Sequence, residues 1–332
     1  MLALLTEEQE MVRDLAGEVA ESCRLANPGD QVDAAKGWAE LTQAGLLGLR
    51  TREGGTPAAS GVEAALVAGA FGGALAPVPY LTSGILVAEL LALAGADSWL
   101  DELASGEVRY ALLLTPDLKG LAGPGAQAVA WDVEGASYAL GLTVDGRPCR
   151  TSLEGFSRAE CADRTRPIAR GTATSVEELG EPVDLDRWLA LALSAVAADA
   201  AGAMRAALEG VVAYAKERIA YGVPIGSFQA IQHLCADALV QCEAAASCVA
   251  YASWAVDALD PAEALLAART AKAYTSTEGL SVCETVMQVY GGIGQTWEHI
   301  AHYYTRRVML DAHLLGDASD QLTKIADARL GG

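Results

Sequence analysis

Three helical segments of about 30 residues each occupy the second half of the chain, and their length is the strongest constraint on its fold. The first covers residues 188–220, and the second runs from about 228 to 259 with Ser227 as its expected cap. The third covers residues 260–290 and begins at Asp260, which is followed by a proline and, three positions on, by a glutamate. Because helices of this length are stabilised mainly by packing against one another, the pattern predicts an antiparallel bundle.

The rest of the chain divides into two shorter regions. A helical region opens with Thr6 and Gln9, which have the spacing of a capping box. A middle region contains short apolar runs separated by glycine, proline and aspartate, which predicts a small β insert. The expected helices of the first region are residues 31–45, 61–73 and 83–93, and the expected strands of the middle region are 108–114, 128–133 and 138–144. We therefore predict a mainly α protein with a small β insert, divided into residues 1–106, 107–182 and 183–332.

Charge and cysteine content narrow the class of protein. The 332 residues include 43 acidic and 23 basic side chains, a formal net charge of −20, which argues against nucleic acid or an anionic membrane as partner. Seven scattered cysteines without a CxxC pair indicate reduced thiols of a cytoplasmic protein. The N-terminus has no basic region before its apolar residues, and the longest apolar stretches, such as 83–95, are interrupted or too short to span a bilayer. We expect neither a signal peptide nor a membrane segment.

Two short segments carry possible chemistry. Arg218 lies at the C-terminal end of the first long helix and is interpreted either as a cation at a helix end or as a fork for phosphate oxygens. Residues 288–294 read either as a helix stop or as a glycine turn that lets a ligand approach the backbone. Together the two segments could hold a pyrophosphate. His299 and His302 lack a third ligand at suitable spacing, so no metal site is predicted.

These segments resemble the acyl-CoA dehydrogenase family over nearly the whole chain. Residues 218–232 are similar to its R-x-x-[FY]-G-x-P-I-x-x-F-Q-x-x-Q block, and residues 288–294 are similar to its Q-x-[FY]-G-G-x-G block. Residues 5–9, 45–49 and 73–79 are similar more weakly. The resemblance implies an N-terminal helical domain, a middle β domain and a C-terminal four-helix bundle.

The resemblance also implies chemistry with FAD. In this family a carboxylate removes a proton next to the thioester of an acyl-CoA while a hydride passes from the neighbouring carbon to the flavin. Alignment puts Ala192 and Leu315 at the two positions where that base occurs, and neither side chain accepts a proton. The sequence offers Asp317 in a shifted loop, or Asp186 or Asp199 on a shifted helix, as substitutes. The family's flavin-ring segment has no match in residues 114–120.

The retained blocks are the ones that the family extends to a neighbouring subunit's FAD. By resemblance, the cofactor-binding residues are Arg218, Tyr221, Gln229, Gln288, Gly291 and Gly292. A chain with these contacts and without a base resembles the non-catalytic subunit of an actinobacterial α2β2 acyl-CoA dehydrogenase that acts on steroid side chains. This implies a larger catalytic partner subunit that holds most of the FAD, an acyl-CoA substrate and an electron-transfer flavoprotein or similar acceptor.

Two other functions fit the same sequence. One is a self-sufficient homo-oligomeric acyl-CoA dehydrogenase with a displaced carboxylate. The other is a flavin-free binding or scaffold protein that retains the fold.

Overall fold

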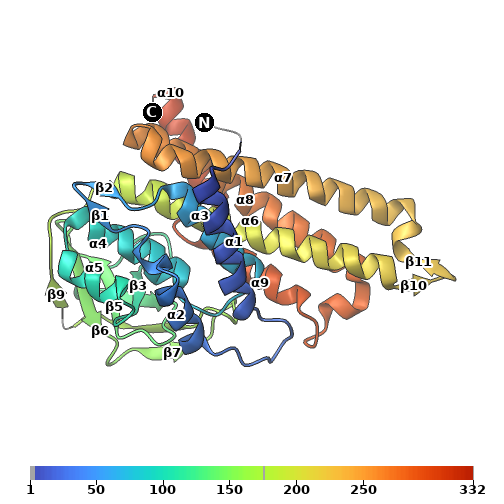
Figure 1. Ribbon diagram of the computed structural model, residues 1–332, viewed down its shortest axis with the longest axis horizontal. Helices are drawn as coiled ribbons and strands as arrows, with labels where there is room; N and C mark the ends of the chain where they lie inside the picture. Colours follow the sequence, from blue (N-terminus) through green and yellow to red (C-terminus); the bar gives the residue numbers. More distant parts are fainter. Residues whose placement is uncertain (1–3, 175, 332) are drawn as a thin grey trace.

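The computed structural model describes residues 4–174 and 176–331, which form a helical layer, a sheet and a long helix bundle (Figure 1). Thr6 caps the first helix through both hydrogen bonds of the predicted capping box. The helices of the N-terminal region are α1 (Glu7–Ser22), α2 (Ala34–Gln43), η1 (Leu46–Gly48), α3 (Gly61–Gly73), η2 (Tyr80–Val87), α4 (Ala88–Ala94) and α5 (Asp97–Ala104). The predicted helix over 61–73 is confirmed at both ends. The one over 83–93 starts earlier, because η2 is a π-helix that continues directly into α4.

The middle region forms one seven-stranded sheet in the order β7-β8-β4-β3-β5-β6-β9. All neighbouring strands are antiparallel except β3 and β5. The strands are β3 (Tyr110–Leu114), β4 (Gln127–Trp131), β5 (Tyr138–Leu142), β6 (Pro148–Ser152), β7 (Ser157–Ala159), β8 (Ile168–Thr172) and β9 (Val176–Glu178). The three predicted strands are present, and four others were missed because they are short or polar. A small hairpin of β1 (Arg52–Glu53) and β2 (Thr56–Pro57) lies outside this sheet.

The bundle consists of long helices joined by short turns, as predicted. Its elements are α6 (Leu185–Glu217), β10 (Ile219–Ala220), β11 (Val223–Pro224), η3 (Ile225–Ser227), α7 (Gln229–Ala258), α8 (Pro261–Tyr290), η4 (Gly291–Gln295), α9 (Ala301–His313) and α10 (Ala318–Leu330). Asp260 caps α8 as expected. The expected Ser227 cap of α7 is wrong, since the Ser227 hydroxyl donates instead to the Pro224 carbonyl and Phe228 occupies the cap position.

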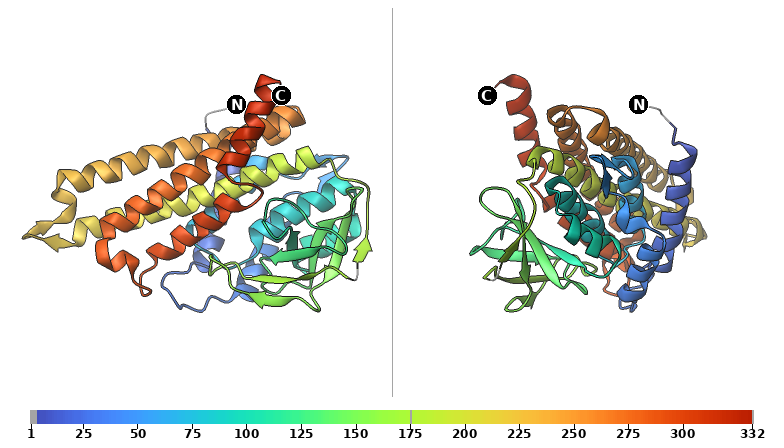
Figure 2. Two further views of the ribbon diagram at one scale, coloured as in Figure 1. Left: turned by 180° about the vertical axis from the view of Figure 1, so that it is seen from behind. Right: turned by 60° about the vertical axis from the view of Figure 1, so that its left-hand side comes forward.

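The bundle extends well beyond the sheet. Figures 1 and 2 show the sheet beside one half of α6, while β10 and β11 project from the opposite end. Glycines let α3 cross α6 closely, because a Cβ at Gly202 would overlap the Gly69 carbonyl oxygen. A separate apolar core, with Met204, Val211 and Val282 among its members, fills the projecting half. The projecting end is therefore a packed part of the bundle.

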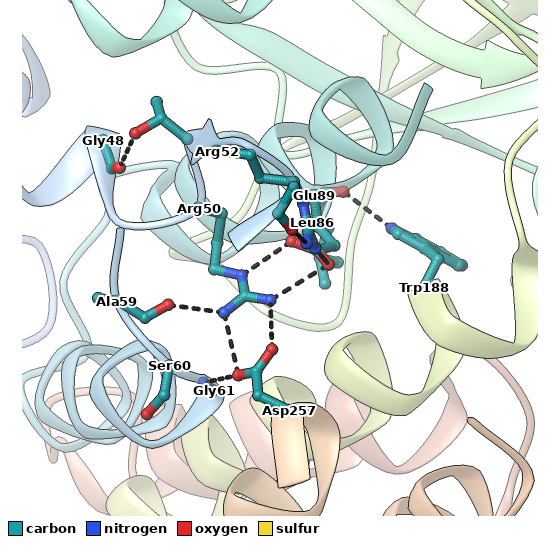
Figure 3. Close-up of polar contacts among 12 residues, drawn as sticks. Gly48, Arg50, Arg52, Ala59, Ser60, Gly61, Leu86, Glu89, Trp188 and Asp257 are labelled. Atoms are coloured by element: carbon teal, nitrogen blue, oxygen red, sulfur yellow. Dashed lines mark hydrogen bonds and ion pairs between the residues drawn. The ribbon is translucent and has the colours of Figure 1, made fainter. Parts of the chain in front are cut away.

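A buried arginine joins the N-terminal helices to the bundle (Figure 3). The Arg50 guanidinium is fully buried, and its Nε lies 2.8 Å from Glu89 on α4. Its Nη2 lies 3.2 Å from Asp257 near the end of α7, and Asp257 also accepts the Gly61 amide at the start of α3. Because a buried charge is stable only when it is paired, these contacts fix the three elements relative to one another.

Helix α7 leaves an apolar face uncovered. Both α6 and α7 are long and apolar enough to cross a membrane, so the expectation that every apolar segment is too short is wrong for these two helices. Most of the apolar stretch of α6, 72%, is buried inside the fold, whereas 22% of the α7 stretch is buried. Leu239, Val240 and Tyr251 are the large exposed apolar side chains of α7. The length of α6 therefore reflects a core helix, and α7 has a surface suited to a partner.

Candidate functional site

The predicted cofactor residues lie at the projecting end of the bundle, which we call the bundle end (residues 218–229 and 288–295). Here β10 pairs with β11 in a hairpin whose two turn residues, Tyr221 and Gly222, have φ angles of 55° and 82°. Positive φ at both positions is the geometry of the tightest hairpin turns, and it is unusual for a tyrosine. Tyr221 is 97% exposed at the tip. The hairpin thus holds an aromatic side chain out in solvent.

Arg218 links α6 to this hairpin and keeps its side chain free. Its amide donates to the Tyr214 carbonyl and its carbonyl accepts the Ile225 amide, so its backbone ends the helix and aligns the hairpin. The residue is exposed, and none of the hydrogen bonds or ion pairs found in residues 4–174 and 176–331 involves its guanidinium. A guanidinium without an internal partner is available to an external anion.

The end of α8 lies at the same end of the bundle. Tyr290, its last residue, packs on Tyr214 of α6 with ring centroids 5.0 Å apart. Gly291 has a φ of 66°, and a Cβ at Gly291 or Gly292 would meet open space. Gln288 on α8 is exposed, as is Gln229 at the start of α7. The structure therefore brings all six predicted cofactor residues to the bundle end and leaves them accessible.

The two aligned base positions lie elsewhere, between the bundle and the sheet. Ala192 is fully buried in the apolar core of α6, and Leu315 is 3% exposed in the turn between α9 and α10. We call residues 312–317 the base turn. Leu315 has a φ of 58°, a strained value for a leucine, so the surrounding contacts must hold this backbone in place.

Polar groups from two helices hold the base turn. Lys272 on α8 is buried, and its Nζ donates to the carbonyls of Ala312 and Gly316 at 3.0 and 3.1 Å. The Gln321 side-chain amide donates to the Leu315 carbonyl at 2.8 Å. Burial lowers the pKa of Lys272 to about 8, and the carbonyl oxygens around it provide the compensating contacts. Side chains of α8 and α10 thus hold the backbone of the base turn in place.

The loop after β3 holds the base turn from the opposite side. We call residues 115–120 the β3 loop, the segment in which the resemblance leads us to expect the family's flavin-ring motif. The Leu315 amide donates to the Leu118 carbonyl at 2.9 Å, and Lys119 lies 2.6 Å from Asp320 at the start of α10. Leu118 also has a positive φ, 62°. The β3 loop and the base turn are therefore in direct contact.

The substitute carboxylates are engaged in structural contacts. Asp317 caps α10 through a reciprocal hydrogen-bond pair with Asp320 and lies 3.7 Å from Lys119. Asp186 is exposed in the first turn of α6, where a negative charge favours the helix dipole. Asp199 is fully buried and 2.6 Å from Arg166. Although burial opposes it, the adjacent arginines lower the pKa of Asp199, which makes this carboxylate a weaker base.

Asp199 belongs to a buried ion cluster that the sequence did not indicate. Its members are Asp163, Arg166, Asp199, Arg307 and Asp311, all at most 2% exposed. Arg307 lies 2.7 Å from Asp163 and 3.2 Å from Asp199, and Arg166 lies 3.4 Å from Asp311. Burial, reinforced by Asp199, raises the pKa of Asp311 well above its ordinary range. A protonated Asp311 leaves two guanidiniums facing two carboxylates, a balanced arrangement for a buried site.

A second buried acid lies beside this cluster. Asp132, at the end of β4, accepts a hydrogen bond from Thr82 of η2 at 2.9 Å. Burial raises the pKa of Asp132 to about 6, while Arg166 acts in the opposite direction. A hydroxyl donor and the nearby Arg166 are thus the groups that act on this buried carboxyl.

Comparison with known proteins identifies the family. Residues 189–330 match the acyl-CoA dehydrogenase C-terminal domain. Acyl-CoA dehydrogenase IpdE2 of Mycobacterium tuberculosis is 34% identical over 264 residues, which are 79% of this chain and 76% of that relative. The chain belongs to the acyl-CoA dehydrogenase family. It is therefore related to flavoprotein oxidoreductases that act on CH–CH bonds, and FAD is the cofactor of this family.

Solved structures share the whole fold. A variant of the Tcur3481-Tcur3483 steroid acyl-CoA dehydrogenase superposes with a TM-score of 0.81, at 25% identity and 98% coverage of both chains. The ChsE4-ChsE5 complex of Mycobacterium tuberculosis superposes with a TM-score of 0.80, at 22% identity and full coverage of both chains. The mainly α fold with a β insert is thus confirmed, together with the similarity to subunits of complexes.

The two regions fit FAD differently. At the bundle end, a free guanidinium, exposed amide side chains and accessible glycine backbone match the oxygen atoms of a pyrophosphate. At the base turn, the Leu315 amide is hydrogen bonded to the Leu118 carbonyl, and the Leu315 side chain offers no proton acceptor. The described residues of the bundle end therefore fit the phosphate end of the cofactor, and the two aligned base positions offer no proton acceptor for chemistry beside its ring.

Proposed function

We propose that this chain is the non-catalytic subunit of a heteromeric FAD-dependent acyl-CoA dehydrogenase. It contributes the bundle end to FAD that is held mainly by a larger catalytic subunit in an α2β2 assembly. The complex introduces an α,β double bond into an acyl-CoA thioester and passes electrons to an electron-transfer flavoprotein or similar acceptor. Because a steroid acyl-CoA dehydrogenase has this fold at 25% identity, we propose a steroid side-chain CoA as substrate.

One observation carries the proposal. The Leu315 amide donates to the Leu118 carbonyl, and the Leu315 side chain cannot accept a proton. We infer that this contact closes the ring and thioester site of this chain. Arg218 at the opposite end remains free for a ligand outside the chain. A chain that offers cofactor contacts only outward is suited to complete a neighbour's site.

The exposed apolar surface of α7 supports a protein partner. The apolar face of α7, defined by Leu239, Val240 and Tyr251, lies on the helix that follows the hairpin carrying Tyr221. Large exposed apolar side chains on one face are typical of surfaces that another protein covers. We propose that the catalytic subunit packs on α7 and the hairpin.

The test is activity of the chain alone and with its partner. We expect the purified chain to dehydrogenate no acyl-CoA, and co-expression with a longer acyl-CoA dehydrogenase encoded beside it to give turnover. Leu315→Glu should leave the isolated chain inactive, because the closed contact to Leu118 excludes the flavin ring as well. An artificial electron acceptor reports the activity in each case.

Two alternatives predict different results. A yellow homo-oligomer whose activity is lost in Asp317→Asn would contradict the proposal and indicate a displaced base. A colourless chain that assembles with no flavoprotein would contradict it as well and indicate a scaffold.

A further inference from the structure

A cavity of about 670 Å³ lies at the other end of the sheet from the β3 loop. It is bordered by the segment that leads into α2, by Arg109 directly before β3, by Glu134 and Gly135 after β4, and by Arg164 before β8. Because Arg109 precedes β3 and the β3 loop follows it, the whole strand separates this cavity from Leu118. The cavity is therefore distinct from the closed ring site, and it contains none of the bundle-end residues.

Two guanidiniums border the cavity without a carboxylate partner. Among the ion pairs of the described residues, none includes Arg109 or Arg164. Arg109 is half-buried with its Cζ 5.1 Å from the Trp38 ring centroid, and Arg164 lies 5.5 Å from that of Trp297. The face of an indole ring orients a guanidinium and leaves its N–H edge free. Burial also lowers the pKa of Arg109, while Glu134 and Asp33 act in the opposite direction, and an added anion would further offset the cost of burial.

The acidic residues around the cavity already have donors. Glu134 is 3.1 Å from Arg158, and Asp33 Oδ1 accepts the amides of Ala35 and Lys36 at the start of α2. Asp30 Oδ2 accepts from Asn27, at 2.7 Å from its amide. These contacts use one oxygen of each aspartate. The second oxygen of Asp30 and of Asp33 has no donor among the described residues and can accept from a hydroxyl or amino group.

We propose that this cavity binds a nucleoside phosphate. The phosphate oxygens would bridge the guanidiniums of Arg109 and Arg164, and ribose hydroxyl or base amino groups would donate to Asp30 and Asp33. Tyr303 and the two prolines at 77 and 167 supply apolar walls for a base. The volume is in the range of sites for ligands of this size. An inorganic anion would leave most of the cavity unfilled, and a fatty anion would place its chain against the carboxylates.

Calorimetric titration of the purified chain with AMP tests this site. We expect AMP to bind, and Arg109→Ala and Arg164→Ala each to weaken the affinity roughly 10- to 150-fold, as the loss of a charge-assisted contact predicts. Adenosine, which lacks the phosphate, should bind equally to wild type and to both variants. Arg170→Ala, which removes an exposed arginine from β8, is the matched control and should leave AMP affinity unchanged.

Two further experiments complete this test. Competition identifies the source of the nucleotide, and lysine variants replace any alanine variant that does not fold. Competition by CoA would assign the nucleotide of the coenzyme, and absence of competition would assign a free nucleotide. If either alanine variant unfolds, Arg109→Lys and Arg164→Lys replace it, with partial loss expected because an ammonium lacks the fork. No AMP binding at millimolar concentration, or binding that is insensitive to both arginines, would overturn the proposal. Binding that is lost only in Arg218→Ala would overturn it too, since it would put AMP at the bundle end.

Discussion

The bundle end and the base turn contain residues of similar chemistry in opposite states. At the bundle end, Arg218 has ordinary helix-end backbone bonds and an exposed guanidinium without a partner among the described residues. At the base turn, the Lys272 and Gln321 side chains donate to backbone carbonyls, and the Leu315 amide donates to the Leu118 carbonyl. The polar side chain at the bundle end is thus available to another molecule, whereas the polar groups at the base turn stabilise the fold of this chain.

The largest expected effect comes from the buried ion cluster beside the base turn. Asp199→Ala leaves Arg166 and Arg307 buried with too few carboxylates, which should lower the free energy of unfolding by about 3–5 kcal/mol. Urea unfolding followed by circular dichroism measures this. Asp186→Ala, on the exposed first turn of the same helix, is the control and should cost under about 1 kcal/mol. Equal effects of the two substitutions would remove the distinction between structural and available charges.

The second-largest expected effect is a loss of FAD affinity when Arg218 at the bundle end is replaced. Arg218→Ala should weaken FAD binding to the assembled complex roughly 10- to 150-fold, since a hydrogen bond to a charged group contributes about 1.5–3 kcal/mol. Arg218→Lys should recover part of this. Lys216→Ala removes another exposed cation from the last turn of α6 and should leave FAD affinity unchanged. Titration of FAD into apo-complexes of verified size measures all three, and equal affinities would mean that Arg218 is only a helix-end cation.

The smallest expected effect is a pH dependence of the free energy of unfolding, which arises from the buried Asp132. Burial raises the pKa of Asp132 to about 6 from 3.8, so the folded state holds this proton more tightly than the unfolded state. Its contribution to stability is present at low pH and is lost as pH rises from about 4 to 6. The free energy of unfolding of Asp132→Asn, taken relative to that of wild type, should therefore rise by about 2 kcal/mol from pH 4.5 to pH 7. Urea titrations at both pH values test this, and a stability difference independent of pH would show that Asp132 is ionised throughout.

Local signals were sufficient to predict most helices. The capping box at Thr6, the helix over 61–73 and the Asp260 start of α8 depend on neighbours within a few residues, so the sequence states them directly. The strand β8 was not predicted, and neither were the earlier start and π geometry of η2 within the predicted helix over 83–93, because these features depend on packing and lack a clean period. Ser227 was placed at a cap because serine favours that position, but its hydroxyl finds the Pro224 carbonyl first.

The candidate site was predictable only where residues act close in sequence. The family blocks around Arg218 and Gly291 are contiguous, and they indicated the bundle end before the fold was known. The buried ion cluster joins residues from 163 to 311, and no local pattern connects them. The contact between Leu118 and Leu315 likewise spans nearly 200 residues and uses only backbone atoms, which no side-chain pattern reveals.

We propose that this chain completes the FAD site of a partner subunit and binds no flavin in a ring site of its own. The direct measurement is flavin absorbance against total protein in the purified complex, with subunit ratio determined by mass. The account predicts one FAD for each pair of unlike chains, so an α2β2 assembly carries two. One FAD for every chain would mean that Leu118 and Leu315 separate to admit a flavin, and it would contradict the account.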